Sequence, residues 1–264
     1  MLVIAGSGRY PALVIEEARR AGVGSIFVAA FTNETPESTA ALADRVEWVK
    51  VGQLGRLLRF AASTGARRAI MAGQIAPRNL FDLRPDLQAI MILAKLKRRN
   101  AETIFGAVAD RLSAAGITLL PATTFLDDHM ATPGLIAGPQ PKPRVLEDIA
   151  YGREIARETS RLDIGQSVVV RHGTVLAVEA FEGTDACIRR GGELGRGQAV
   201  LVKVTKPGQD MRFDVPVIGS RTLETAHQSG VSVIAVESGR TLLLDKPSLA
   251  GDAANKGISL YGIS

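Results

Sequence analysis

The stretch LVIAGSGRYP, residues 2–11, decides the fold of the first half of the chain. Its four apolar residues predict a buried strand, its glycines allow a tight turn, and its proline suits the first turn of a following helix. The same alternation continues to about residue 125, with strands expected at residues 25–30, 46–50, 68–72 and 117–120 and helices at 12–21, 53–64 and 101–115. It predicts an α/β domain built on a parallel sheet covered on both faces.

The second half follows a stretch rich in proline and glycine, residues 132–144, which is expected as a linker. The domains are therefore expected at residues 1–131 and 145–264. Two apolar runs that meet at His172-Gly173 suit a tight hairpin, which favours a mixed α/β sheet in the second domain. The remaining elements are expected as strands at residues 199–205, 215–218, 231–236, 241–244 and 258–261 and as helices at 145–161 and 222–229.

Composition narrows the class of protein. With 264 residues, 46% hydrophobic and 22% charged, the chain is expected to be a soluble globular protein. The longest apolar stretch, residues 87–96, is too short to span a bilayer, and the N-terminus turns glycine-rich too soon for a signal peptide. The cytoplasm is therefore the expected location.

One cysteine, Cys187, excludes an internal disulfide, and with only three histidines no tetrahedral zinc set has the customary spacing. Any metal is expected to be hard and bound by oxygen. The net charge of +5 favours an anionic partner. Nucleic acid is not expected, because aromatic residues make up only 5% and no basic stripe alternates with stacking rings.

Two predicted strands of the first domain end in residues that allow close approach of a ligand. Ligands bind at the carboxyl ends of parallel strands, so these positions are candidates for binding a phosphate or a sugar edge. A tight turn without a ligand is the alternative, and a nicotinamide cofactor is disfavoured because the third glycine of that fingerprint is replaced by proline. The candidate substrate-binding residues here are Gly6, Ser7, Gly8, Gly73 and Gln74.

A second candidate lies where the hairpin strand of residues 174–180 breaks into Glu182-Gly183-Thr184-Asp185. Thr184 is a good N-cap for a helix over residues 186–190. The free N–H groups of that helix would then lie beside Glu179, Glu182 and Asp185, a combination that suits a phosphate with a divalent cation.

The third candidate is KPGQDMRFDVPVIG, residues 206–219. Its alternation predicts a strand with Arg212 and Asp214 on one face. One interpretation is an Arg212–Asp214 ion pair at a sheet edge. The other is that Asp214 binds Mg²⁺ or takes a proton from water while Arg212 and Lys206 hold phosphate oxygens.

Two further segments each allow two interpretations. Gly165 is expected to end the helix of residues 145–161, so Asp163 is either a surface charge or a site residue. Residues 87–99 are interpreted as a buried helix with a basic end, or as a helix whose apolar face meets acyl chains while its cations lie over anionic headgroups.

Several of these motifs together resemble the LpxI family of UDP-2,3-diacylglucosamine pyrophosphatases of lipid A biosynthesis. The similarity rests on RLDIGQ (161–166), VLAVEAFEGTDACIRR (175–190), KPGQDMRFDVPVIG (206–219) and TLETAHQSG (222–230), with weaker N-terminal counterparts in AGSGRYP and MAGQIAPRNLFDLRPD. It implies a Rossmann-like N-terminal domain and a C-terminal domain that carries the catalysis. It also implies a homodimer and is compatible with peripheral contact at the inner membrane.

The activity that the resemblance implies is Mg²⁺-dependent attack of water on the α-phosphorus of the lipid-linked UDP-sugar, giving UMP and 2,3-diacylglucosamine 1-phosphate (lipid X). Asp214 matches the essential aspartate, as a metal ligand or general base. A noncatalytic nucleotide-sugar or lipid-phosphate binding protein is the alternative, because Asn100-Ala101-Glu102 stands where the family often has Gly-Asp-Asp. The implied metal ligands are Asp214, Glu179 and Asp185, and the further substrate-binding residues are Asp163, Gln166, Gly183, Thr184, Asp185, Lys206 and Arg212.

Overall fold

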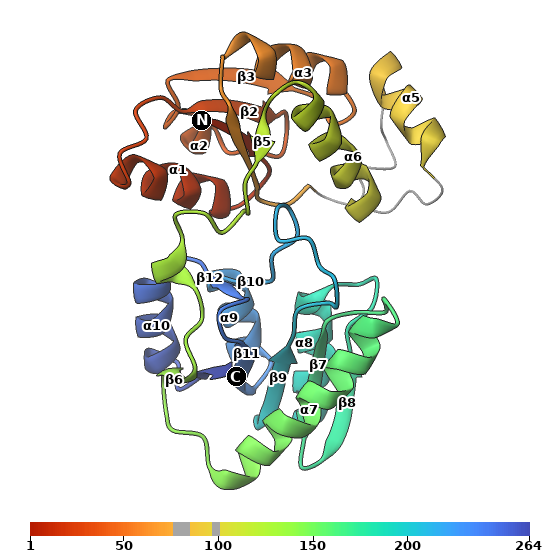
Figure 1. The fold of residues 1–264 in the computed structure, drawn as a ribbon. Helices are drawn as coiled ribbons and strands as arrows, with labels where there is room; N and C mark the ends of the chain where they lie inside the picture. The colour runs from red at the N-terminus through yellow and green to blue at the C-terminus, as the bar shows by residue number, and fades with distance from the viewer. Residues whose placement is uncertain (76–84, 97–100) are drawn as a thin grey trace. The chain divides into compact units, whose positions relative to one another are not determined.

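The computed structural model describes residues 1–75, 85–96 and 101–264, and it divides the chain into two compact units (Figure 1). Unit 1 comprises Met1–Leu126 and Asp210–Asp214, and unit 2 comprises Asp127–Gln209 and Val215–Ser264. The stretch 132–144, expected as a linker, lies in unit 2 and contains the strand β6 (Gly134–Ala137).

Within the described residues, the sheet of unit 1 has five strands in the order β3-β2-β1-β4-β5, and all neighbouring pairs are parallel. The predicted parallel sheet is therefore confirmed. Every residue of the central strand is buried, as expected for a strand that helices cover on both sides. The strands are β1 (Leu2–Ala5), β2 (Phe27–Phe31), β3 (Arg45–Val49), β4 (Arg68–Ala72) and β5 (Thr118–Leu119).

The helices of unit 1 pack on this sheet through apolar faces, and Pro11 stands in the first turn of α1 as predicted. The four-residue helix α2 was not expected from the sequence, because so short an element has no apolar periodicity. Unit 1 contains α1 (Tyr10–Arg20), α2 (Glu37–Ala40), α3 (Leu54–Ser63), α5 (Leu87–Lys95) and α6 (Ala101–Ala114).

Helix α5 is not the buried helix of the first interpretation. Ala89 and Ile92 are buried, but Leu87, Ile90 and Met91 are 72%, 50% and 47% exposed. One face of the helix packs on unit 1 and the other presents apolar side chains to solvent. The cations at its end, in the Lys95 side chain and residues 97–99, lie outside the described part of the chain.

The main sheet of unit 2 has the order β6-β13-β11-β9-β7-β8. Strands β9, β11 and β13 are mutually parallel, whereas β6, β7 and β8 pair in antiparallel fashion with their neighbours, so the predicted mixed sheet is confirmed. A separate parallel pair joins β10 (Val217–Ile218) to β12 (Leu242–Leu243). The main strands are β7 (Ser167–Arg171), β8 (Thr174–Val178), β9 (Ala199–Lys203), β11 (Val231–Glu237) and β13 (Ser259–Ile263).

The hairpin at His172-Gly173 is also confirmed, with φ of 50° and 70° at the two turn residues. Both turn N–H groups donate to the buried carboxylate of Asp148, at 2.9 and 2.7 Å. That carboxylate compensates two donors that the left-handed turn would otherwise leave unpaired.

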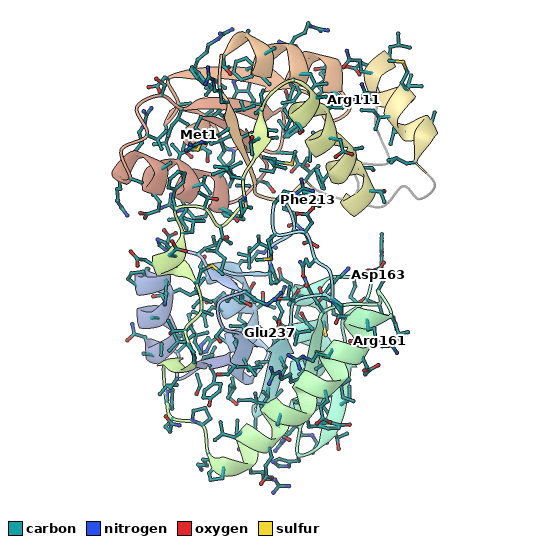
Figure 2. All side chains as sticks on the ribbon, viewed as in Figure 1. Met1, Arg111, Arg161, Asp163, Phe213 and Glu237 are labelled. Atoms are coloured by element: carbon teal, nitrogen blue, oxygen red, sulfur yellow. The ribbon has the colours of Figure 1, made fainter. Side chains whose placement is uncertain are left out.

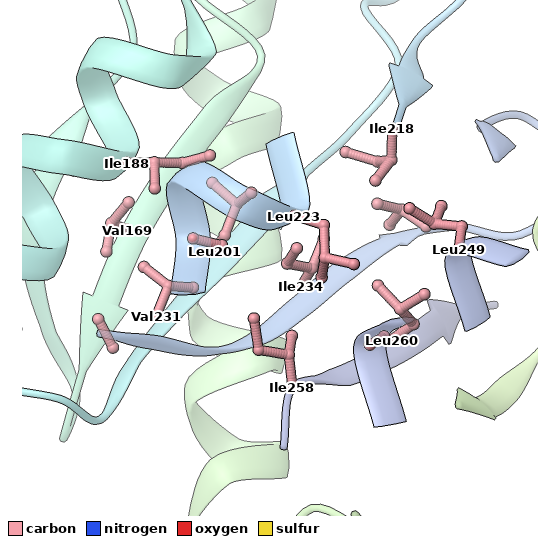
Figure 3. Packing of buried hydrophobic residues seen from close by; sticks show 14 of the residues in the cluster. Val169, Ile188, Leu201, Ile218, Leu223, Val231, Ile234, Leu249, Ile258 and Leu260 are labelled. Atoms are coloured by element: carbon pink, nitrogen blue, oxygen red, sulfur yellow. The ribbon is translucent and has the colours of Figure 1, made fainter. Parts of the chain in front are cut away.

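Helices cover both faces of this sheet. On one face, α8 (Thr184–Gly195), α9 (Ser220–Gln228) and α10 (Lys246–Asn255) enclose the apolar core shown in Figure 3, and on the other lies α7 (Pro143–Arg161). A short 3₁₀ turn, η1 (Asp127–His129), begins the unit. Nowhere in the described part of the chain does a helix combine the length and apolar character required to span a membrane.

Helix α8 is longer than the predicted residues 186–190, because it continues through Gly191 and Gly192 to Gly195. A Cβ on Gly191 would lie 2.4 Å from Cβ of Val169, and one on Gly192 would lie 2.2 Å from the carbonyl oxygen of Ser229. These glycines therefore let the helix pack closely on its neighbours instead of ending it. Helix α10 was also missed in the sequence.

Candidate functional site

The structure brings the strand-end residues of unit 1 together at the carboxyl ends of β1 and β4. Both the N–H and the Oγ of Ser7 donate to the carbonyl oxygen of Gln74, at 2.7 Å each. A Cβ on Gly6 would lie 2.6 Å from that oxygen, and one on Gly73 would lie 2.7 Å from the carbonyl oxygen of Ser7. Close backbone approach thus explains two of the glycines, whereas Gly8 (φ 84°) has open space around it. Substrate binding here stays a prediction.

The predicted strand with Arg212 and Asp214 on one face is wrong, because residues 210–213 form a turn in the structure. The carbonyl oxygen of Asp210 accepts the N–H groups of Phe213 and Asp214 at 3.1 and 2.9 Å. The guanidinium of Arg212 binds the carboxylate of Asp210, with Nε at 3.0 Å and Nη2 at 2.6 Å. The Arg212–Asp214 ion pair of the first interpretation is thus replaced by a local Arg212–Asp210 pair, and the hydrogen bond from Arg212 lowers the pKa of the Asp210 carboxyl group.

This turn is anchored to unit 1 and leaves Asp214 available. The ring of Phe213, labelled in Figure 2, lies 5.9 Å from that of Phe105, and the carbonyl oxygen of Met211 accepts the N–H of Ala122 at 2.8 Å. The side chain of Asp214 is half-buried, and its carboxylate makes no hydrogen bond or ion pair with another described residue. Asp214 can therefore accept a proton or hold a ligand without breaking a protein contact.

At the carboxyl edge of the unit 2 sheet, Thr184 is the first residue of α8 and Gly183 (φ 85°) occupies the cap position. The prediction of Thr184 as the N-cap is wrong, because its hydroxyl is used elsewhere. Thr184 Oγ1 donates to Glu179 Oε1 at 2.8 Å and accepts a hydrogen bond from Lys203 Nζ at 2.9 Å. Both Glu179 and Lys203 are buried, and Glu179 Oε2 has no hydrogen-bond partner.

Lys203 was not identified from the sequence. It ends the strand AVLVK, in which it is the one residue that is not apolar. A charged residue at the carboxyl end of an apolar parallel strand was the signal that would have indicated it.

The two other acids of this region form ion pairs on the surface. Asp185, in the first turn of α8, lies 2.9 Å from Nε of Arg221 in the first turn of α9. Glu182 lies 2.6 Å from Nη2 of Arg190. Their carboxylates are thus held near the N-terminus of α8.

Helix α7 ends at Arg161 with Leu162 as its C-cap, and the left-handed residue that follows is Asp163, not Gly165 as predicted (Figure 2). Asp163 has φ of 57°, its N–H donates to the carbonyl oxygen of Ser160, and the N–H of Ile164 donates to that of Thr159, both at 3.0 Å. This pair of bonds is the Schellman motif, in which the left-handed residue is usually glycine. Here aspartate occupies it.

Gly165 instead packs closely on the backbone just after β8, because a Cβ there would lie 2.0 Å from the carbonyl oxygen of Glu179. The structure also joins Asp163 to Lys206, whose Nζ donates to Asp163 Oδ1 at 2.8 Å. The side-chain Oε1 of Gln166 is buried without a partner. Asp163, Gln166 and Lys206 therefore lie at the same sheet edge as Glu179.

The ligands implied for Mg²⁺ are divided between the units, with Asp214 in unit 1 and Glu179 and Asp185 in unit 2. Among the residues that the structure describes, no group of three or more His, Cys, Asp or Glu could hold a metal. Glu179 Oε2 is nevertheless a hard, buried oxygen without a partner, which fits a hard cation. The full ligand set stays a prediction, and Asn100 and the Glu102 side chain lie outside the described residues.

Cys187 is a buried residue of α8 with a free thiol. Burial raises the pKa of its thiol to about 12. A thiol with so high a pKa is not a nucleophile at neutral pH.

Comparison with known proteins covers both units. Residues 1–129 match the LpxI N-terminal domain and residues 132–261 match the LpxI C-terminal domain. The chain is also 32% identical over 226 residues to the UDP-2,3-diacylglucosamine pyrophosphatase LpxI of Caulobacter vibrioides, with 81% of each chain covered. The resemblance seen in the motifs is thus confirmed, and this two-unit α/β protein belongs to the LpxI family.

Proposed function

We propose that this protein hydrolyses the pyrophosphate bond of UDP-2,3-diacylglucosamine and releases UMP and 2,3-diacylglucosamine 1-phosphate. The observation that carries the proposal is the match to both LpxI domains along nearly the whole chain. The Caulobacter relative is a UDP-2,3-diacylglucosamine pyrophosphatase, and it supplies the substrate and the bond that is broken in this proposal. The partner of this protein is accordingly a lipid-linked UDP-sugar.

Asp214 is the proposed catalytic residue. Its carboxylate has no partner among the described residues, and it follows directly after a turn that holds the guanidinium of Arg212. As a general base it would take a proton from the attacking water, a role that typically contributes about 10²- to 10⁴-fold to the rate. Arg212 and Lys206 are proposed to bind phosphoryl oxygens, for which their cationic donors are suited.

The proposed cofactor is Mg²⁺, with Asp214, Glu179 and Asp185 as its oxygen ligands. When bound, it would supply neutralisation of the negative charge on the phosphoryl oxygens. Support within unit 2 comes from the unpartnered Glu179 Oε2. Asp185 would have to share its carboxylate with Arg221, which binds Oδ2.

The test is release of UMP from UDP-2,3-diacylglucosamine by the full chain, in Mg²⁺ and in EDTA, for the wild type, Asp214→Asn and the control Asp252→Asn. Asp252 is an exposed residue of α10 in unit 2. We expect Mg²⁺-dependent release that Asp214→Asn lowers by about 10²- to 10⁴-fold and Asp252→Asn leaves unchanged. Saturable binding of the lipid nucleotide without any UMP release would instead establish a noncatalytic binding protein.

The exposed apolar face of α5 supports a second element of the proposal, peripheral contact of the protein with acyl chains at a membrane surface. Leu87, Ile90 and Met91 form this face. Vesicles of anionic phospholipid should bind the wild type and not a variant with serine at these three positions. The control is Leu194→Ser on α8, since Leu194 is 59% exposed. A homodimer, also proposed, is tested by sedimentation at micromolar concentration.

A further inference from the structure

Lys203 is a buried cation at the end of an apolar strand. It is 7% exposed, and the other four residues of β9 are buried. Ala199 and Leu201 belong to the core under α8 and α9, so strand alternation places Lys203 on that same face. Burial of a lysine costs free energy unless its charge is compensated, so Lys203 requires an explanation.

The protein supplies little of that compensation. The Nζ atom of Lys203 donates to Thr184 Oγ1 at 2.9 Å, and no carboxylate oxygen of a described residue lies within 4.0 Å of it. Glu179 is reached only through the hydroxyl of Thr184. An ammonium group has three N–H donors, so Lys203 keeps donors for a further acceptor.

The surroundings of Lys203 favour negative charge. Helices α8 and α9 both begin at this edge of the sheet, and the ion pair Asp185–Arg221 joins their first turns. Helix N-termini carry partial positive charge, which adds to that of Lys203. Ser167, the register partner of Lys203 on β7, is fully buried, and its Oγ has no hydrogen-bond partner.

We propose that Lys203 is an anion-binding residue whose amine binds a phosphoryl oxygen of the substrate diphosphate. Thr184 Oγ1, itself held by Glu179, keeps the amine in place, and the N-terminus of α8 adds its N–H groups on the same side. The identity of the anion rests on the proposed function. The presence of an anion site rests only on Lys203, the two helix ends and the unpartnered hydroxyl of Ser167, which can donate to an anion.

The first experiment measures binding of inorganic pyrophosphate by calorimetry in EDTA, so that no metal mediates it. The wild type is compared with Lys203→Met, with Lys203→Gln, and with the control Lys246→Met at the start of α10, whose Nζ donates to the carbonyl oxygen of Met130. We expect both Lys203 variants to raise Kd by about 10- to 100-fold and the control to match the wild type. The glutamine variant keeps a hydrogen-bond donor for Thr184 but removes the positive charge. It therefore tests whether the charge is needed for binding if the methionine variant does not fold.

A wild type that does not bind pyrophosphate, or folded Lys203 variants that bind it as tightly as the wild type, would overturn the proposal. The second experiment measures UMP release. Pyrophosphate should inhibit it competitively, and Lys203→Gln should raise KM. Noncompetitive inhibition would assign the anion to some other ligand and overturn the link to the substrate. A wild type without UMP release would refute the proposed function, while the calorimetry would still decide whether Lys203 binds an anion.

Discussion

In each unit a ligand is expected at the carboxyl ends of parallel strands, but these strand ends are built differently in the two units. In unit 1 the residues that follow β1 and β4 contact one another through their backbones. Ser7 and Gln74 are hydrogen bonded, and Gly6 lies close to Gly73. In unit 2 the end of β9 carries the cation of Lys203, beside a helix N-terminus and buried atoms without partners. Glycine at a strand end therefore indicates close packing as readily as it indicates a ligand, whereas a buried charge requires a counterpart.

The largest expected effect comes from breaking the backbone contact of unit 1. Gly73→Ala would place a Cβ 2.7 Å from the carbonyl oxygen of Ser7 at a φ of 89°. We expect a loss of about 3 kcal/mol in the free energy of unfolding, from steric overlap together with left-handed strain. Urea unfolding of the full chain measures it.

Gly8→Ala is the matched control, because Gly8 has a similar φ of 84° and open space where the Cβ would stand. It should lose only about 1 kcal/mol. Equal losses in the two variants would mean that the backbone angle, and not the contact between β1 and β4, requires glycine in unit 1.

An intermediate effect is expected at the charged edge of unit 2. Glu237, labelled in Figure 2, ends β11. Its Oε2 accepts the N–H of Thr205 at 2.9 Å, and its Oε1 lies 3.3 Å from Nη2 of Arg157. Burial alone would raise the pKa of Glu237, but the hydrogen bonds from Thr205 and Arg157 lower it overall. Glu237→Gln should cost about 2 kcal/mol at pH 7, because it removes a charged acceptor.

The pH dependence of this difference has a defined sign. Because the pKa of Glu237 is lower in the folded than in the unfolded protein, its contribution is present at neutral pH and is lost as the pH falls through the folded pKa. The stability of the wild type and of Glu237→Gln should therefore converge in acid. The control Glu193→Gln, at an exposed position of α8, should run parallel to the wild type. A constant difference across the pH range would exclude this explanation.

The smallest expected effect on stability is at Asp163. Asp163→Gly would relieve the left-handed φ of 57° and remove the exposed pair with Lys206. Both contributions are small, so the free energy of unfolding should change by less than about 0.5 kcal/mol. If Asp163 contacts the substrate, KM for the UDP-lipid should rise all the same. An unchanged KM would leave Asp163 as a helix-end residue only.

The sheets were predictable because their strands are short apolar runs separated by clear turns. β1 and β4 were predicted with the bounds observed, and the hairpin at His172-Gly173 followed from its two-residue connection. The helix of residues 186–190 was predicted too short because Gly191 and Gly192 look like stop signals in isolation. Their role depends on Val169 and Ser229, which only the folded sheet brings close.

The grouping of several candidate residues could be predicted from the sequence, whereas the side chains with which they pair could not. Asp163, Gln166, Glu179, Thr184 and Lys206 do gather at one edge of unit 2. The interpretation that pairs Arg212 with Asp214 rested on strand alternation, which places Asp210 and Asp214 on the same face as Arg212 and does not choose between them. The turn at residues 210–213 brings Asp210, two residues before Arg212, within hydrogen-bond distance of the guanidinium. Lys203 was overlooked although it ends the apolar run AVLVK, and its burial is a property of the folded sheet.

The small segment Asp210–Asp214 has a consequence for the synthesis of the protein. Unit 1 begins at Met1, yet its last members, Met211 and Phe213 among them, are encoded after most of unit 2. A ribosome exposes all five strands of the first sheet well before these residues emerge. Unit 1 therefore stays incomplete during synthesis until the turn that carries Arg212 and Asp214 has been made. A gene fragment that stops at residue 126 would encode the sheet of unit 1 without this turn.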